Sequence, residues 1–201
     1  RPPEGRRIPR PISFLREPLR ERRRPLPRPG PGELLIRVGA CAVCRTDLHV
    51  VDGDLGAARR PIVPGHEVVG RVEVVGEGVA GFAPGDRVGV PWLGWTCGSC
   101  AFCEGGAENL CDQARWTGKD VDGGYAEYMT IPEGFAVRIP DDFTDAQAAP
   151  LMCAGAIGFR SLRLTGITDG MTLGLTGFGA SAHLVLKMVR HRFPGTRVYV
   201  F

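Results

Sequence analysis

Four of the seven cysteines fall within fifteen residues at the spacing C-x2-C-x2-C-x7-C; they are Cys97, Cys100, Cys103 and Cys111. Thiolates so close together on one loop can complete a tetrahedron around Zn²⁺, with zinc–sulfur distances of ~2.3 Å. Gly98, Gly105 and Gly106 give the loop the backbone freedom that this geometry needs. Sulfur would fill every position of the ion, so the site would be structural rather than catalytic.

An iron–sulfur cluster and a set of disulfides are the alternatives for this loop. The bacterial cluster pattern also begins C-x2-C-x2-C, but it continues with three residues and a Cys-Pro pair. Here seven residues separate Cys103 from Cys111, and Asp112 follows. Disulfides are concentrated in secreted proteins, and this chain has an odd number of cysteines and no secretion signal. The spacing therefore favours zinc.

Two further motifs carry possible ligands but are weak when taken alone. The first is Cys44-Arg-Thr-Asp-Leu-His49, and the second is Gly65-His66-Glu67. A single histidine beside a glycine is more often a structural residue than a ligand. Cys41-Ala-Val-Cys44 has the spacing of a redox pair, but no thioredoxin-like βαβ pattern surrounds it.

The order of all the motifs resembles that of the zinc-dependent alcohol dehydrogenases of the medium-chain dehydrogenase/reductase superfamily. The similarity runs from about Glu17 to the C-terminus, and the four-cysteine loop with the Gly-His-Glu motif is its most specific part. The other matching motifs are Cys44–His49, Pro64–Gly70, Gly85–Val88, Gly123–Tyr128 and a predicted helix that bears Cys153.

The resemblance implies a second, catalytic zinc ion held by Cys44, His66 and Cys153. Three protein ligands leave the fourth position to water or to a substrate oxygen, which Lewis-acid catalysis by zinc requires. Glu67 is implied as an occasional or outer ligand. Asp47 is implied to accept the second ring N–H of His66 and so to fix its tautomer.

The same resemblance implies the reaction, which is reversible oxidation of an alcohol to an aldehyde or ketone with hydride transfer to NAD or NADP. Thr46 would take the hydroxyl proton, and His49 would pass it to solvent. Trp92, Leu93 and Trp95 stand where family members line the substrate pocket. We therefore expect a small alcohol or aldehyde as substrate and a homo-oligomer in the full-length enzyme.

The elements that must position these residues are first of all short strands. Residues 33–39, 68–75 and 87–90 are rich in β-branched residues and are bounded by glycine or proline, as in an all-β domain. Thr144-Asp-Ala-Gln147 has the form of a capping box, and an apolar-rich stretch follows through Leu164. We predict that Cys153 projects from the helix that begins there.

The C-terminal part has the pattern of a dinucleotide-binding unit. Residues 171–176 are predicted to form a buried strand, residues 183–190 a helix and residues 197–201 a second strand. The turn between the first strand and the helix reads G-x-G-x-x-A, which admits a pyrophosphate to a helix N-terminus. The candidate cofactor-binding residues in it are Gly177, Gly179, Ala180 and Ala182.

The predicted fold class is a mostly β GroES-like catalytic domain followed by the start of an α/β Rossmann-type nucleotide-binding domain. Residues 1–30 are expected to be a partly disordered arm, 31–155 the zinc-binding domain, and 156–201 a truncated nicotinamide-binding domain. The residue that selects NAD or NADP lies about 20 residues past the glycines, at or beyond Phe201. We expect the 201-residue chain to bind zinc but to show little or no dehydrogenase activity.

Charge and hydropathy exclude other classes of partner. Residues 1–30 hold ten of the 25 basic residues and three of the 22 acidic ones, so the remainder has a net charge of −4. Such a body lacks the basic patch that nucleic acid needs. No apolar stretch of 18 residues occurs, which predicts a cytoplasmic protein without a membrane span.

Two alternatives to the dehydrogenase are weaker. A zinc-free relative of the quinone-reductase type would share the fold but would have no use for the second ligand set. A zinc-binding interaction module could use the four-cysteine loop alone and bind nucleic acid through the arginine-rich arm. The charge of the body argues against this second alternative.

Overall fold

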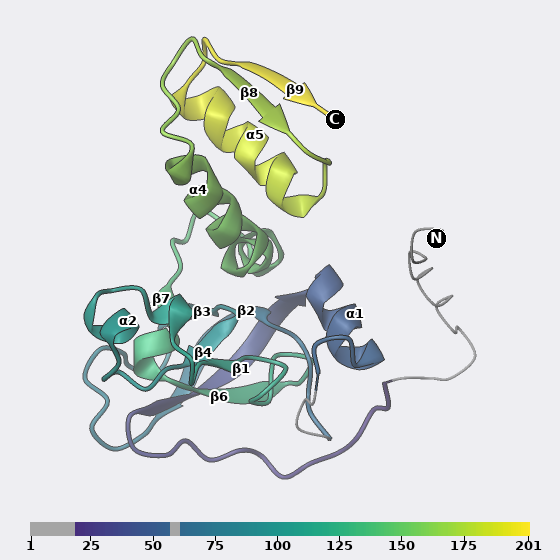
Figure 1. The fold of residues 1–201 in the computed structure, drawn as a ribbon. Helices are drawn as coiled ribbons and strands as arrows, with labels where there is room; N and C mark the ends of the chain where they lie inside the picture. Colours follow the sequence, from purple (N-terminus) through teal and green to yellow (C-terminus); the bar gives the residue numbers. More distant parts are fainter. Residues whose placement is uncertain (1–18, 57–60) are drawn as a thin grey trace, which may run out of the picture.

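The computed structural model describes residues 19–56 and 61–201. A part rich in strands lies below a smaller part made of α4, α5, β8 and β9 (Figure 1). The arm predicted at residues 1–30 lies partly outside the described residues; its described portion, 19–30, contains neither helix nor strand.

A five-stranded antiparallel sheet with the order β6-β1-β2-β3-β7 forms the larger part. Its strands are β1 (Glu33–Ala42), β2 (Glu67–Val75), β3 (Arg87–Val90), β6 (Tyr128–Pro132) and β7 (Val137–Arg138). The strand predicted at 33–39 extends to Ala42, because the chain passes Gly39 through an irregularity in the β1–β2 register instead of leaving the sheet.

Strands β1 and β2 are buried on both faces over residues 34–36 and 68–70, and the sequence is continuously apolar there. One face packs into a core cluster that includes Ile36, Val68 and Ile131. On the other face, Val69 packs against Ala149 and the residues around it. This second layer matters for the site, because it fixes the segment that ends at Cys153.

Short elements outside the sheet flank several of the candidate ligands. They are α1 (Arg45–Asp52), β4 (Leu93–Trp95), α2 (Ala101–Glu104), the 3-10 turns η1 (Glu108–Leu110) and η2 (Glu133–Phe135), and β5 (Arg115–Trp116). Strands β4 and β5 pair as a separate two-stranded sheet. The four-cysteine loop therefore lies between two paired strands.

The predicted helix from 144 to 164 is divided into three pieces. They are α3 (Asp145–Ala148), the 3-10 turn η3 (Ala149–Met152) and α4 (Ala154–Leu164). Thr144 and Gln147 form the predicted capping box. Pro150 cannot donate a backbone hydrogen bond, so the helix tightens there, and Cys153 leaves the helical region with φ −126° and ψ −72°. Cys153 thus lies at the start of α4, and its prediction as a residue within a helix was wrong.

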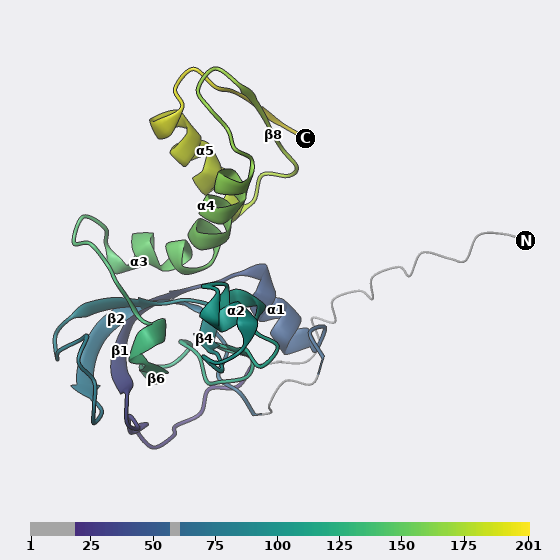
Figure 2. The same cartoon turned by 60° about the vertical axis from the view of Figure 1, so that its left-hand side comes forward.

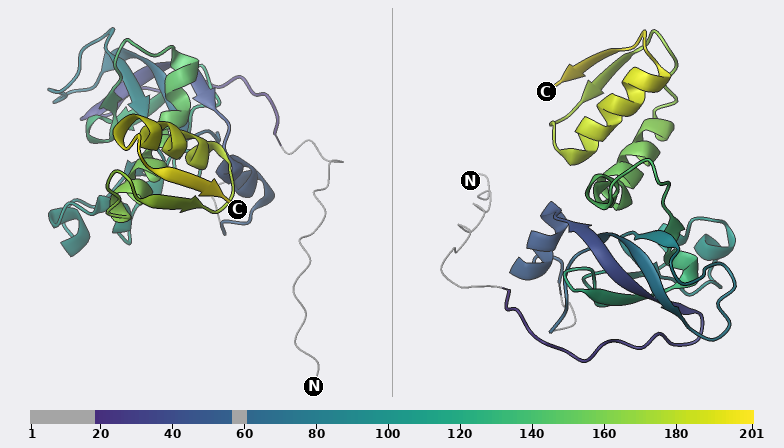
Figure 3. Two further views of the ribbon diagram at one scale, coloured as in Figure 1. Left: turned by 90° about the horizontal axis from the view of Figure 1, so that it is seen from above. Right: turned by 180° about the vertical axis from the view of Figure 1, so that it is seen from behind.

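The smaller part contains the predicted strand–turn–helix–strand unit. Strands β8 (Thr172–Leu175) and β9 (Arg197–Val200) pair in parallel, with α5 (Ala180–Arg192) between them in the chain (Figure 3). Helix α5 begins three residues before the predicted start, because Gly179 takes the N-cap position and the following alanines favour a helix. Among the described residues, no helix is long and apolar enough to cross a membrane.

Candidate metal centres

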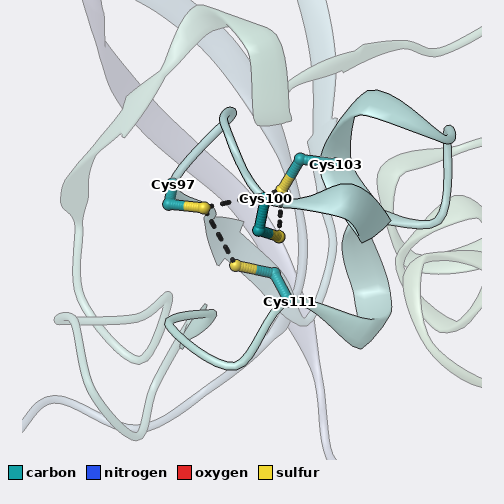
Figure 4. Close-up of side chains that lie close together, drawn as sticks. All are labelled: Cys97, Cys100, Cys103 and Cys111. Atoms are coloured by element: carbon teal, nitrogen blue, oxygen red, sulfur yellow. Dashed lines mark hydrogen bonds between the residues drawn. The ribbon is translucent and has the colours of Figure 1, made fainter.

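The sulfur atoms of the four-cysteine loop point toward one another (Figure 4). All four lie within 4.8 Å of one another. The Sγ–Sγ distances are 3.9 Å for Cys97–Cys103, 3.5 Å for Cys100–Cys103 and 3.6 Å for Cys97–Cys111. A tetrahedron with zinc–sulfur bonds of ~2.3 Å has sulfur–sulfur edges of about 3.8 Å. The loop therefore has the geometry of a zinc site without further rearrangement.

Backbone amides prepare one of these thiols for metal binding. The hydrogen bond from the Ser99 N–H, with help from neighbouring thiols, lowers the pKa of Cys97 from 9.0 to about 6. Zinc binds the thiolate, so a thiol that is already ionised at neutral pH is a better ligand. Apart from the zinc ion, little would hold the loop in place, because neither α2 nor η1 contains a buried residue.

A second cluster forms from three separate parts of the chain. The ligand atoms of Cys44, His66, Glu67 and Cys153 lie within 4.8 Å of one another. Cys44 is the N-cap of α1, His66 directly precedes β2, Glu67 is the first residue of β2, and Cys153 lies between η3 and α4. The structure thus brings together every residue predicted for the second ion; their role as ligands stays a prediction.

Asp47 joins two of these ligands into one unit. Its Oδ1 accepts hydrogen bonds from His66 Nδ1 at 2.9 Å and from the Gly65 amide at 3.2 Å, and its Oδ2 accepts from the Cys44 amide at 2.8 Å. Burial alone would raise the pKa of Asp47, but the bonds from His66 and Cys44 outweigh it and lower the pKa below its usual range. Asp47 therefore stays ionised and orients the imidazole.

The free nitrogen of His66 is the clearest sign that the second cluster fits a metal. His66 is fully buried, and its Nε2 has no hydrogen-bond partner among the described residues. The edge of its ring contacts Trp92, with centroids 4.7 Å apart and planes at 67°. A buried nitrogen without a partner is costly unless it binds something. Zinc suits this nitrogen and the two thiols beside it.

The electrostatics of the second cluster also favour a cation. Burial, and then the neighbouring Cys44 and Glu67, raise the pKa of Cys153 to about 12. Burial likewise raises the pKa of Glu67, although its carboxylate accepts a hydrogen bond from the Ala154 amide at 3.4 Å. Several acidic groups confined in one buried place resist ionisation together, and a divalent cation removes that obstacle.

Cys41 does not belong to either cluster. Its thiol and that of Cys44 are both free, so the C-x2-C pair that they form is not a disulfide here. Burial raises the pKa of Cys41 to about 12, and its Sγ donates to the Ala42 carbonyl at 3.7 Å. These are the properties of a structural thiol rather than of a redox centre.

The two predicted relay residues lie on α1, near the second cluster. The hydroxyl of Thr46 lies 3.7 Å from the Cys44 sulfur. His49 pairs through Nδ1 with Asp54 Oδ2 at 2.9 Å on the surface. No direct hydrogen bond joins the side chains of Thr46 and His49 in the described part of the chain, so a proton relay would need another group between them.

The predicted cofactor turn lies between β8 and α5. Gly177 has φ +80°, a conformation that favours glycine, and Gly179 is the N-cap of α5. Ala180 and Ala182 lie in the first turn of α5. The first backbone amides of a helix have no partner within the helix, so they are free to bind a group at its N-terminus. The geometry is that of an anion-binding helix N-terminus, and cofactor binding itself stays a prediction.

The Gly123–Tyr128 motif has a structural role that the sequence did not disclose. Gly123 and Gly124 donate to the carbonyls of Val63 and Gly65 at 2.7 and 2.9 Å, and Tyr125 donates to Pro64 at 2.9 Å. The two segments are thus joined along their backbones, directly before His66. Only small residues permit so close an approach.

We expect Gly65→Ala to destabilise the protein by about 2–4 kcal/mol, which combines left-handed backbone strain with a steric clash. Gly65 has φ +97°, and an added Cβ would lie 2.8 Å from both the Tyr125 nitrogen and the Cys41 sulfur. Chemical denaturation measures the loss. Gly78→Ala is the matched control, because φ is +79° there but nothing lies within 4 Å of the added Cβ. Equal losses in the two variants would show that packing at Gly65 is unimportant.

The chain is similar to known proteins over most of its length. A family model described as the alcohol dehydrogenase GroES-like domain matches residues 30–141. The chain is 54% identical to a probable alcohol dehydrogenase, AdhA, of Mycobacterium tuberculosis over 168 residues, which are 81% of this chain and 49% of that protein. It is 40% identical to an alcohol dehydrogenase of Geobacillus stearothermophilus over 180 residues, which are 89% of this chain and 53% of the relative.

Solved structures give the same result. A cinnamyl alcohol dehydrogenase of Sorghum bicolor superposes with a TM-score of 0.80 at 35% identity, over 87% of this chain and 52% of that one. A cobalt- and zinc-bound thermostable alcohol dehydrogenase of Pyrobaculum aerophilum also gives 0.80, at 32% identity, over 88% and 53% of the two chains. These matches confirm the predicted fold class. The chain spans about half the length of the relatives that it matches.

Proposed function

This chain belongs to the zinc-dependent alcohol dehydrogenases of the medium-chain dehydrogenase/reductase superfamily, and on this basis we propose that it provides the two zinc sites of such an enzyme. The proposed reaction is the reversible oxidation of an alcohol to an aldehyde or ketone with NAD or NADP. The free, buried Nε2 of His66 beside two thiols supports the proposal most directly. A homo-oligomeric assembly stays a prediction from the resemblance, and a cytoplasmic location stays a prediction from the hydropathy of the sequence.

The residues of the second cluster have distinct proposed tasks. A zinc ion held by Cys44, His66 and Cys153 would supply Lewis acidity toward an alcohol oxygen. Asp47 holds the imidazole so that Nε2 faces the ligand position. Glu67 is proposed as an outer group, because its carboxylate already accepts the Ala154 amide and faces the cluster.

Proton removal is assigned to Thr46 and His49. The Thr46 hydroxyl lies beside the Cys44 sulfur and can accept a hydrogen bond from the substrate hydroxyl. His49 lies one helical turn further along α1 and is partly exposed, so it can exchange a proton with solvent. Asp54 holds Nδ1 of His49, which leaves Nε2 for the relay.

The proposed substrate is an apolar alcohol or aldehyde. Trp92 contacts the His66 ring and stacks on Trp116, with ring centroids 5.4 Å apart and planes at 19°. Two stacked indoles beside the ligands form a wall that favours an apolar or flat substituent. Trp116 was not identified from the sequence as part of this wall, because it reaches Trp92 only through the pairing of β4 with β5.

The geometry is less favourable to the two alternative functions. A zinc-free quinone reductase has no need for two thiols and an unpartnered imidazole nitrogen in one buried place. An interaction module built on the four-cysteine loop alone leaves the second cluster without a purpose. Metal content separates the three functions, because the dehydrogenase predicts two zinc ions per chain, the zinc-free reductase none and the interaction module one. Only the dehydrogenase predicts an ion that accepts an alcohol.

An alcohol should change the absorption spectrum of the cobalt-substituted protein. Co²⁺ replaces Zn²⁺ at thiolate sites, and its visible bands respond to a new ligand. We expect benzyl alcohol to shift the bands of the ion at Cys44, His66 and Cys153, because that ion has an open position. The ion in the four-cysteine loop should not respond, since sulfur saturates it. The measurement requires no cofactor.

The control for this experiment is Cys44→Ala, which retains only the loop ion and should give a spectrum that benzyl alcohol does not alter. A wild-type spectrum with two cobalt ions and no response to saturating alcohol would contradict the proposed chemistry. Binding of only one cobalt ion by the wild type would contradict the second site itself.

A further inference from the structure

Cys153 differs from the other proposed ligands in how it is held. Asp47 binds both the Cys44 amide and the His66 ring, so these two ligands keep their relative positions even without metal. Cys153 comes from a segment much later in the chain, and no described hydrogen bond links it to Asp47. Apart from the 3.4 Å hydrogen bond from the Ala154 amide to Glu67, its position depends on how residues 139–153 attach to the sheet.

An ion pair between β3 and α3 makes that attachment. Arg87 donates from Nε to Asp145 Oδ1 at 2.9 Å, and its Nη2 lies 2.8 Å from the same oxygen. Its Nη1 donates to the Pro140 carbonyl at 2.6 Å. The Arg87 side chain is only 8% exposed, whereas that of Asp145 is 39% exposed. One buried guanidinium thus holds both the start of the segment and its first helix.

The sheet is shaped to receive this ion pair. Helix α3 lies across the face of the sheet formed by β1 and β2 (Figure 2). The Asp145 carboxylate occupies the space that a Cβ at Gly39 would need, so the glycine that interrupts the β1 register also admits the carboxylate. This glycine was expected to end a strand; in the structure it makes room for a contact.

Apolar packing continues the attachment as far as the ligand. Met152, the residue before Cys153, is 8% exposed and packs in one cluster with Val69 and Ala149. Its sulfur occupies the space beside Gly89 of β3, where a larger residue would collide with it. Arg87 and Gly89 lie on the same strand two residues apart, so one strand contacts the segment at both ends.

We propose that Arg87 and Asp145 are positioning residues for the catalytic zinc: they fasten residues 139–153 to β3 and thereby hold Cys153 beside Cys44 and His66. This inference rests on the proposed zinc site. It gives the Gly85–Val88 motif, which the proposed reaction does not use, a role in assembling the site. Neither residue touches the ligand atoms, so both act through the segment that they hold.

The test compares Asp145→Asn and Arg87→Met with the wild type in a competition for zinc against a chromophoric chelator. We expect one of the two zinc ions to bind about 10–100-fold more weakly in each variant, the range for residues that orient a ligand without binding the metal. The ion in the four-cysteine loop should keep its affinity and serves as an internal reference. The double variant should lose no more than either single variant, because both remove the same contact.

The control is Arg37→Met, which breaks the exposed Arg37–Glu73 ion pair of the same sheet, 3.3 Å long, without touching residues 139–153. Both zinc ions should bind normally in this variant. Unchanged affinity in Asp145→Asn and Arg87→Met would overturn the proposal. Equal weakening of both ions would also overturn it, because it would indicate general destabilisation.

Amide hydrogen exchange of the zinc-free protein separates this inference from the proposed function. If Arg87 and Asp145 fasten the segment, the amides of residues 147–154 should exchange faster in both variants, while those of β1 and β2 remain protected. A wild type that binds only one zinc ion would refute the catalytic site, and the inference with it, whatever the exchange shows. Two wild-type ions with unchanged exchange in the variants would refute the inference alone.

Discussion

Replacement of Cys44 by alanine should leave one zinc ion per chain instead of two, and replacement of Cys97 by alanine should also leave one. We expect these equal losses because the two ligand sets share no residue, and each set holds its own ion. Removing one of three protein ligands, or one of four, leaves too few donors to compete for zinc. Elemental analysis of protein freed of loose metal by gel filtration measures the stoichiometry.

Cys41→Ala is the matched control for this pair. Cys41 lies three residues before Cys44 and is equally free, but it belongs to neither cluster. It should therefore retain both ions. Loss of an ion from Cys41→Ala, or retention of two ions by Cys44→Ala, would show that the second ligand set is wrongly assigned.

Loss of the zinc ion should affect the structure differently in Cys97→Ala and in Cys44→Ala. The region from Cys97 to Cys111 has no core of its own, since neither α2 nor η1 has a buried residue. Its order depends on the metal, as in zinc fingers, where binding and folding are one process. We expect the amides of this loop to lose protection in Cys97→Ala. In Cys44→Ala the sheet should keep its protection, because its core is independent of the ion.

Local features of the sequence predicted the elements and the ligand types well. The residues 87–90 were predicted as a strand and form β3, because β-branched residues alternate with small ones there. The capping box at Thr144 also formed as predicted. Both features depend on neighbours in sequence, so composition and spacing are sufficient to predict them.

Contacts between distant segments could not be predicted in this way. Arg87 and Asp145 are 58 residues apart, and nothing in either local sequence indicates the partner. The break at Cys153 arises because packing of Met152 on β3 competes with helix continuation past Pro150. The pattern of a single sequence reveals neither the partner of Arg87 nor the outcome of the competition between packing and helix continuation. These two features determine where Cys153 lies.

Asp47→Asn should weaken zinc binding at the second cluster by about 10–100-fold while the four-cysteine loop keeps its ion. The substitution preserves size but removes an acceptor. Asp47 accepts from Cys44 through one oxygen and from Gly65 and His66 through the other. An amide has a single acceptor oxygen, so its NH2 group must face at least one of these donors. Chelator competition, followed ion by ion, measures the effect.

The shortage of acceptor oxygens in Asp47→Asn should also lower the stability of the zinc-free protein. Asp47 is 3% exposed, so water cannot satisfy the donors that the amide fails to serve. We expect a loss of about 1–3 kcal/mol, the usual cost of a buried group left without a partner. Asp54→Asn is the control for zinc affinity, because Asp54 is 58% exposed and pairs with His49 on the surface. If both variants keep wild-type affinity, the His66 ring is oriented by Trp92 and its surroundings, and Asp47 has no role in holding the metal ligand.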